Sequence, residues 1–151
     1  SIDGMGEEFN YIRRGGDWKT TMANIKFLQS HSNVDLRANT VFFVLTAQRI
    51  HQIIDFFMEE IGSIDHTINQ IVMGQYHLRS RNLPIDIKNK VRENLTKSFN
   101  KYKDNLNIAG NITNCLKELD NKATSDGYKE HFDKIDRLQG SNWRKLYPEL
   151  T

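Results

Sequence analysis

The feature that most limits the fold of this chain is a run of five apolar residues, Val41–Leu45, at the end of its clearest predicted strand. The strand is predicted over residues 35–46, and it begins with apolar residues at two alternate positions, Leu36 and Ala38. Continuous apolar character is typical of a parallel strand that is buried on both faces. Because parallel strands are joined by crossover connections, usually helices, this run favours an α/β fold.

Helical periods occupy the sequence on both sides of this strand. Apolar residues recur at helical spacing over residues 5–12 and 18–28 before it, and again over residues 47–61 after it. A further strand is predicted at residues 66–73, and Ile2 is predicted to be the end of a strand. The first half therefore follows the order β-α-α-β-α-β, which implies parallel pairing and right-handed crossovers.

The second half carries helical patterns and no strand signal. Helices are predicted over residues 84–102, with a proline in the first turn, and over residues 112–119 and 126–138. We therefore predict two parts, the α/β part at residues 1–80 and an all-helical C-terminal extension at residues 81–151.

The predicted sheet is small for a parallel one. Three strands, of which the first is cut short at Ile2, would leave a long hydrophobic edge unpaired, and such an edge is an aggregation hazard. The chain also begins with Ser1 rather than with Met. We therefore expect it to be part of a longer protein whose further strands precede Ser1.

The composition describes a folded chain with no strong preference for charged partners. Charged residues make up 26% of the chain, the net charge is +2, and there are only two prolines. Neither disorder nor strong attraction to nucleic acid or anionic membrane is indicated. No apolar stretch approaches the length of a membrane span, and we expect a cytoplasmic protein. Cys115 is the only cysteine, and its place on a predicted helix favours a buried, inert thiol.

Two further patterns favour ordinary structure over chemistry. Basic residues are dense between Arg79 and Lys103, but acidic residues interrupt them and they spread around a helix. A solvated helix face is therefore favoured over nucleic-acid binding. His77 follows a predicted strand, where a substrate could reach it, yet no second histidine stands at metal-ligand spacing.

The first residues hold groups that could bind a ligand. Ser1 and Asp3 follow a predicted strand end, and ligands of open parallel sheets and barrels lie at the carboxyl ends of strands. Arg13 and Arg14 come one helix later, and a guanidinium suits a carboxylate or phosphate through two parallel hydrogen bonds. Taken by themselves, these residues favour an ordinary turn and solvated arginines.

As an ordered set, several segments resemble a known enzyme family. The set is Ser-Ile-Asp-Gly at residues 1–4, Tyr-Ile-Arg-Arg-Gly-Gly-Asp-Trp at 11–18, Asn-Ile-Lys-Phe-Leu at 24–28 and the strand at 37–44. It resembles the middle of a radical S-adenosylmethionine (SAM) enzyme, with the nearest likeness to members that have peptide-modifying (SPASM or twitch) relatives. The resemblance covers about the first half of the chain. The segment at residues 143–150 resembles the ends of some such proteins.

This resemblance implies a fold, two cofactors and a site. The family fold is a partial parallel (β/α) TIM barrel in which a [4Fe–4S] cluster binds SAM and cleaves it reductively. The resulting radical abstracts a hydrogen from the substrate. In the family pattern the residues that match Ser1 and Arg13 contact SAM, with the arginine near its carboxylate. Asp3 could reach the ribose or shape the turn, and Asn39 is a further candidate for the same pocket.

The sequence departs from the family pattern at the cluster. The Cys-x₃-Cys-x₂-Cys segment is absent, and the single Cys115 replaces neither it nor the auxiliary-cluster cysteines of SPASM and twitch members. We therefore expect this chain to contribute part of the SAM pocket and to be inactive alone, with SAM and the cluster as cofactors of the parent. Its expected partners are the missing N-terminal part of the barrel and a peptide or protein substrate.

Two other interpretations stay open. The first is a non-catalytic, cluster-less module that recognises a peptide or protein through its helical tail, and it predicts a chain that folds cooperatively at this length. The second is a basic α/β protein that binds RNA, and it predicts an affinity that falls steeply with salt.

Overall fold

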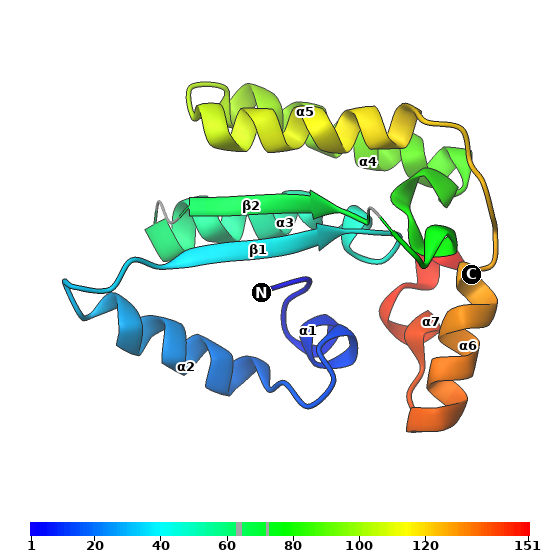
Figure 1. Cartoon of the computed structure of the whole chain (residues 1–151), viewed down its shortest axis with the longest axis horizontal. Helices are drawn as coiled ribbons and strands as arrows, with labels where there is room; N and C mark the ends of the chain where they lie inside the picture. The colour runs from blue at the N-terminus through cyan, green and yellow to red at the C-terminus, as the bar shows by residue number, and fades with distance from the viewer. Residues whose placement is uncertain (63–64, 72) are drawn as a thin grey trace.

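The computed structural model describes residues 1–62, 65–71 and 73–151. The chain is α/β and mostly helical, with a two-stranded parallel sheet at its centre (Figure 1). Among the described residues, no helix is both long and apolar enough to cross a bilayer. The elements, in chain order, are α1 (Glu7–Ile12), α2 (Trp18–Gln29), β1 (Arg37–Phe42), η1 (Thr46–Gln48), α3 (Ile50–Asp55), the π-helix η2 (Phe56–Gly62), β2 (Asp65–Gln70), η3 (Tyr76–Leu78), η4 (Ser80–Asn82), α4 (Ile85–Tyr102), α5 (Leu106–Asp120), α6 (Tyr128–Gln139), α7 (Trp143–Leu146) and η5 (Pro148–Leu150).

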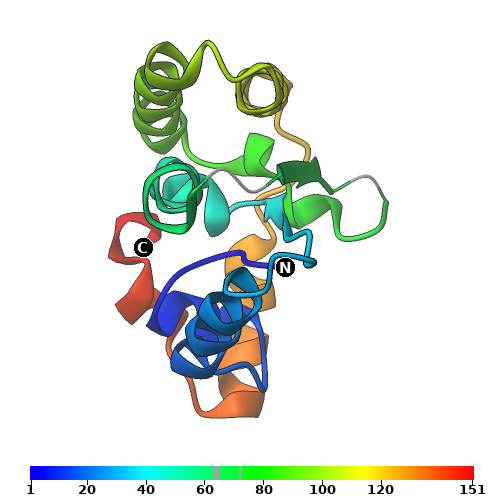
Figure 2. The same cartoon turned by 90° about the vertical axis from the view of Figure 1, so that its left-hand side faces the viewer.

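The sheet has the predicted parallel pairing. β1 and β2 pair from Arg37 opposite Asp65 to Phe42 opposite Gln70. The connection between the two strands contains η1, α3 and η2, so it is the helical crossover that a parallel pair requires. Figure 2 shows α3 on one side of the strands and, within the described chain, no helix on the other side. One face of the sheet therefore packs on helices, and the other face is open.

The two faces of β1 differ, which corrects the prediction of a strand buried on both faces. Ala38, Thr40 and Phe42 are buried, and Ala38 shares an apolar cluster with residues of α3 and η2. Arg37 and Asn39 are exposed on the open face. Because successive side chains of a strand point to opposite faces, β1 buries only one of its two rows of side chains.

The predicted strand at residues 35–46 is too long at its end, because β1 stops at Phe42. The Thr46 hydroxyl accepts a hydrogen bond from the Phe43 N–H over 2.9 Å and donates one to the Val41 carbonyl over 2.5 Å. These bonds turn the chain towards η1, and the residues of the turn are buried in the core. The continuous apolar run therefore reflects a buried turn after a strand that is open on one face.

Helices lie in the predicted segments, and the largest differences are in the bounds of two of them and of one strand. Residues 47–61 form η1, α3 and η2 in succession rather than one α-helix. α5 begins earlier than predicted, because the side chain of Asn105 caps it by accepting a hydrogen bond from the Ile108 N–H over 3.1 Å. The strand predicted at residues 66–73 corresponds to β2, which ends earlier. Val72 of that range lies outside the described residues.

One apolar core takes residues from both predicted parts. Its buried side chains include Phe42 and Ile54 from the α/β part and Leu95, Ile112 and Trp143 from the helical part. Figure 1 shows α4 and α5 along one side of the sheet, with α6 and α7 beyond the ends to which the strand arrows point. The division at residue 80 stays a prediction, and this core crosses it.

The N-terminal segment covers the outer edge of β1. The Ile2 N–H donates a hydrogen bond to the Asn39 carbonyl over 2.8 Å, and the Val41 N–H donates one to Asp3 Oδ1 over 2.7 Å. Ile2 was predicted to end a strand. It makes one backbone hydrogen bond to β1, and the next hydrogen bond along β1 is accepted by the Asp3 side chain instead of by a backbone carbonyl. The predicted unpaired edge is therefore not found on this side of the sheet.

The outer edge of β2 is covered by a side chain of α5. Asn111 Nδ2 donates a hydrogen bond to the His66 carbonyl over 2.8 Å, and Asn111 Oδ1 accepts one from the Ile68 N–H at 3.3 Å. A side-chain amide has the same donor and acceptor as a peptide group, so Asn111 takes the place of a neighbouring strand. Covering an edge in this way is one means by which proteins avoid edge-to-edge aggregation.

Candidate functional site

A pocket that contains two of the predicted site residues lies at the carboxyl ends of both strands. We call it the Asp3–Arg13 pocket, and its volume is about 270 Å³. Its place agrees with the usual position of ligands in parallel α/β folds. It is lined by Asp3, Ile12, Arg13, Val41, Phe43, Ile71, Gln75 and Leu78.

Asp3 ties the Arg13 guanidinium to the sheet. The Asp3 side chain is almost fully buried, and it accepts a hydrogen bond from the Val41 N–H through one oxygen. Its other oxygen lies 2.5 Å from Arg13 Nη2. The Arg13 side chain is 39% exposed, and its Nε–H meets no acceptor among the described residues. Because a guanidinium has five N–H donors, Arg13 keeps donors for an anionic group in the pocket.

The Arg-Arg-Gly-Gly segment determines where Arg13 lies. The Arg13 N–H donates a hydrogen bond to the Phe9 carbonyl over 2.8 Å at the end of α1, and the Gly16 N–H donates one to the Arg13 carbonyl over 2.7 Å. Gly15 has a φ of 81°, a left-handed conformation that favours glycine. At Gly16, a Cβ atom would lie 2.8 Å from the Arg13 carbonyl oxygen and 2.9 Å from the Phe9 ring. The close return of the chain beneath Arg13 therefore requires glycine.

Replacing Gly16 by Ala should lower the free energy of unfolding by about 2 kcal/mol, because the added methyl group forces the backbone away from the Arg13 carbonyl. The matched control is Gly110→Ala inside α5, where nothing lies within 4 Å of the added atom. This control should raise stability by about 0.5–1 kcal/mol, because alanine favours helix. Chemical denaturation measures both variants. Equal stability of the two would contradict the close approach at Gly16.

The other two predicted site residues do not line this pocket. Ser1 is exposed at the start of the chain. Asn39 lies on the open face of β1, where its Oδ1 accepts a hydrogen bond from Asn69 Nδ2 over 3.0 Å. The pocket instead contains Gln75, which the sequence reasoning missed although its tetrapeptide Gly-Gln-Tyr-His was noted for its histidine. Its place directly after a predicted strand was the available signal.

A buried network lies on the helix-covered side of the sheet and joins three chain segments. The Thr40 hydroxyl donates its single proton to the Ile2 carbonyl over 2.6 Å. His66 Nε2 lies 2.9 Å from the same hydroxyl, so it must be the donor of that hydrogen bond. His66 Nδ1 then meets no donor among the described residues. Burial lowers the pKa of His66 from 6.5 to about 4, so the imidazole is neutral at pH 7.

Two residues noted in the sequence lie away from the Asp3–Arg13 pocket. The His77 ring contacts the His131 ring in a tilted arrangement with 4.8 Å between ring centroids, and it lines a different, more open hollow. Cys115 is fully buried on α5, as predicted, and burial raises the pKa of its thiol to about 12. Such a thiol is protonated at pH 7, which agrees with an inert role.

Most of the dense basic stretch is paired with carboxylates. Arg81 makes two hydrogen bonds to Glu118 on α5 at 2.8 and 2.6 Å. On α4, which follows in the chain, Arg92 pairs with Asp120 and Lys97 pairs with Glu93. These pairs leave a surface of mixed charge along α4 rather than a continuous positive stripe.

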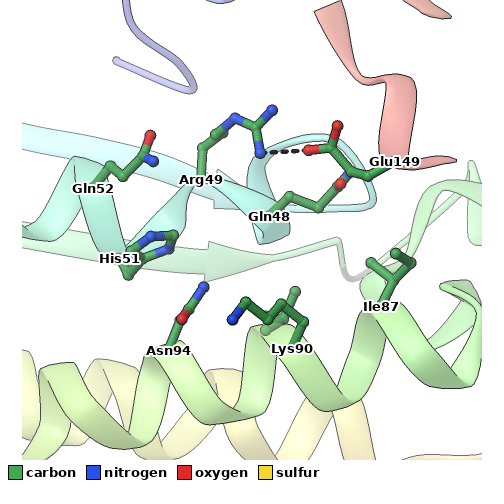
Figure 3. Close-up of a pocket in the computed structure, with 9 residues that line it drawn as sticks. Gln48, Arg49, His51, Gln52, Ile87, Lys90, Asn94 and Glu149 are labelled. Carbon is green, nitrogen blue, oxygen red and sulfur yellow. Dashed lines mark ion pairs between the residues drawn. The ribbon is translucent and has the colours of Figure 1, made fainter.

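A second cavity, of about 320 Å³, lies between the start of α3, helix α4 and the C-terminal turn η5 (Figure 3). Its polar side chains come from all three elements, and Ile87 and Val91 of α4 form its apolar wall. The sequence reasoning did not predict this cavity. The polar and charged residues of its lining are Gln48, Arg49, His51, Gln52, Lys90, Asn94 and Glu149.

The two cofactors implied by the resemblance fit these residues differently. A cation beside a pocket at the strand ends suits the carboxylate of SAM, and Arg13 provides it. An iron–sulfur cluster needs several thiolates, whereas the chain has one buried cysteine, and the described residues contain no group of three metal-binding side chains. This chain therefore fits part of a SAM site and does not fit the cluster.

Comparison with models of protein families, with curated proteins and with solved structures finds no match to this chain.

Proposed function

We propose that this chain is the C-terminal portion of a radical SAM enzyme and that the Asp3–Arg13 pocket binds the amino-acid end of SAM. The observation that carries this proposal is the contact between Asp3 and Arg13, two motif residues, in a pocket at the carboxyl ends of parallel strands. Ligands of barrels and of open α/β sheets lie at that end. Arg13 is the group that binds the carboxylate of SAM, because its guanidinium offers paired donors.

The open face of the sheet supports a partial barrel as the parent fold. Asn39, Thr67 and Asn69 are exposed on this face, whereas α3 covers the other. In a (β/α) barrel the helices lie outside and the opposite faces of the strands point inward. The two strands and the N-terminal segment would then form the rear of the barrel, and residues 81–151 its helical extension.

The contacts of Asp3 give it a positioning role in this proposal. Both of its oxygens are engaged, one by the Val41 N–H and one by Arg13, so the ribose of SAM is left to other groups. The pocket volume of about 270 Å³ lies below the range of roughly 300–1,000 Å³ that small-molecule sites occupy. This chain would therefore hold and orient one end of SAM, and the N-terminal part of the barrel would bind the rest.

The chemistry of the parent is reductive cleavage of SAM followed by hydrogen abstraction from a substrate, by family analogy a peptide or protein. The described residues provide no set of ligands for the cluster that this cleavage requires. The contribution of Arg13 is to bind and orient the carboxylate of SAM. The chain alone should be inactive.

Arg13→Lys should weaken SAM binding about tenfold, because an ammonium keeps the charge beside Asp3 but loses the two parallel donors of a guanidinium. Isothermal titration of the chain with SAM measures this effect. Arg14→Lys is the matched control, since it makes the same change at the next residue, which is exposed and outside the pocket.

A second ligand tests whether the amino-acid end of SAM is the part that this chain binds. Methylthioadenosine lacks that end, so neither the wild type nor Arg13→Lys should bind it. Absence of SAM binding by the wild type, or equal losses in the two arginine variants, would remove the proposed site.

A non-catalytic peptide- or protein-binding module is the second candidate. The observation that favours it is the coverage of both sheet edges, by the N-terminal segment and by Asn111, together with an apolar core that takes residues from both predicted parts. It predicts cooperative unfolding of the chain and no affinity for SAM. Cooperative unfolding together with a failed SAM titration would favour this candidate over the first.

A further inference from the structure

The cavity between α3, α4 and η5 has the features of a second, independent binding site. It lies away from the Asp3–Arg13 pocket, because α3 packs on the face of the sheet opposite to the one that carries Val41. It combines an apolar wall with polar side chains from three elements that are far apart in sequence (Figure 3). Polar groups that converge on one space beside an apolar wall are a feature of small-molecule sites.

One polar group of this cavity lacks a partner although it is buried. Gln48 is 6% exposed, and its Nε2 donates a hydrogen bond to the Val44 carbonyl at 3.3 Å. Its Oε1 is buried and meets no donor in the part of the chain that the structure describes. Leaving a buried acceptor without a donor costs free energy, so a ligand hydroxyl that reached this oxygen, after a shift of the Gln48 side chain that exposes it to the cavity, would gain a hydrogen bond.

The other side of the cavity offers donors and positive charge. Figure 3 shows Lys90 and Asn94 of α4 facing His51 of α3 across the opening. Lys90 has only an exposed partner, Glu93, at 3.6 Å, so its ammonium group is available. Three donors from two helices around one space suit a compact oxyanion, which accepts hydrogen bonds on several oxygens.

The remaining charged residues at this cavity are paired with one another, one arginine with two carboxylates. Arg49 is paired both with Glu8, at 2.8 Å, and with Glu149, so it is not a free cation. Burial lowers the pKa of His51. The nearby carboxylate of Asp55 raises this pKa, and the positive charges of Arg49, Lys90 and Lys97 lower it further. An anion beside His51 would therefore be attracted by Lys90 and would favour the protonated imidazole.

We propose that this cavity binds a small organic phosphate, with Lys90, His51 and Asn94 at the phosphate group and Gln48 Oε1 at a hydroxyl group of the ligand. The apolar wall of Ile87 and Val91 packs against its carbon chain. The site does not rest on the proposed SAM function, since it uses different residues on the other side of the sheet.

The test uses the whole chain and three probes: glycerol 3-phosphate, glycerol and inorganic phosphate. Calorimetry at low ionic strength should give an affinity for glycerol 3-phosphate at least about tenfold higher than for glycerol, because charge-assisted hydrogen bonds are the strong ones. Inorganic phosphate should bind more weakly than glycerol 3-phosphate, because it has no carbon chain for the apolar wall. An NMR titration of the His51 ring should show its pKa rising when glycerol 3-phosphate saturates the site.

Variants locate the binding. Lys90→Met should weaken glycerol 3-phosphate binding about tenfold and His51→Gln should abolish the imidazole signal and weaken binding. Lys90 is 66% exposed, so its removal leaves the core intact. Lys117→Met on the exposed side of α5 is the matched control and should leave binding unchanged. Equal affinity for glycerol and glycerol 3-phosphate, an unchanged Lys90→Met variant, or an equal loss in Lys117→Met would overturn the proposal.

Discussion

Replacing Asn111 by Leu should lower the free energy of unfolding by about 3 kcal/mol, because the Ile68 N–H at the edge of β2 loses its partner and the His66 carbonyl loses the shorter of its two hydrogen bonds. Leucine has nearly the same shape as asparagine but neither donates nor accepts hydrogen bonds. The Ile68 N–H would then remain buried beneath α5 without a partner among the described residues, and the His66 carbonyl would keep one longer hydrogen bond, from Asn107 Nδ2 at 3.3 Å. Urea denaturation, followed by circular dichroism, measures the loss.

Asn114→Leu makes the same exchange one turn further along α5, at an exposed position. It should change stability by less than about 0.5 kcal/mol, as surface substitutions usually do. If Asn111 acts as a substitute strand, the Asn111 variant should also aggregate more readily than the control, because an edge of the sheet becomes available. Similar stabilities for the two variants would show that the edge does not depend on Asn111.

Lowering the pH from 7 to 4 should cost the folded chain about 3 kcal/mol through His66 alone, because burial lowers the pKa of this group from 6.5 to about 4. A protonated ring would place an N–H at Nδ1, which meets no partner among the described residues. The neutral form is favoured in the fold, so the stabilisation is complete above pH 6.5. It is lost progressively as the pH falls from 6.5 to about 4.

His66→Gln tests the source of this acid sensitivity. A glutamine Nε2–H can still donate to the Thr40 hydroxyl, but the side chain does not titrate. The free energy of unfolding of the variant should therefore fall less between pH 6.5 and 4 than that of the wild type. His51 and His131, whose pKa values are also lowered by burial, contribute to the remaining slope, as do carboxyl groups such as Asp133, whose pKa is lowered to about 2 by its hydrogen bond from Arg144. Parallel pH profiles of the two proteins would exclude His66 as the source.

Local sequence signals are sufficient to predict the ends of some helices. Asp17 caps α2 by accepting a hydrogen bond from the Thr20 N–H over 2.8 Å, and Gly140 ends α6 with a φ of 66°. Both interactions are made within a few residues, so spacing alone reveals them. Asn105 gave an equally local signal for the start of α5, and it was overlooked.

The candidate site was predicted only in part, because its assembly is not local. The motif marked Asp3 and Arg13 as site residues, yet their contact depends on Asp3 reaching the Val41 N–H at the edge of β1. Asn39 is on the same face of β1 as Val41, which lines the pocket, but it lies two residues further from the end of the strand, where its side chain bonds Asn69 instead.

The sequence by itself determined which segments are helix or strand and that the strands pair in parallel, since hydrophobic periodicity, caps and element order are properties of neighbouring residues. Only the tertiary structure decided that β1 ends at Phe42, that Asn111 covers the edge of β2, and that η5 closes a cavity against α3 and α4. The end of β1 depends on the buried hydroxyl of Thr46, and the other two features join residues that are far apart in the chain. Neither spacing nor composition specifies which distant groups will meet.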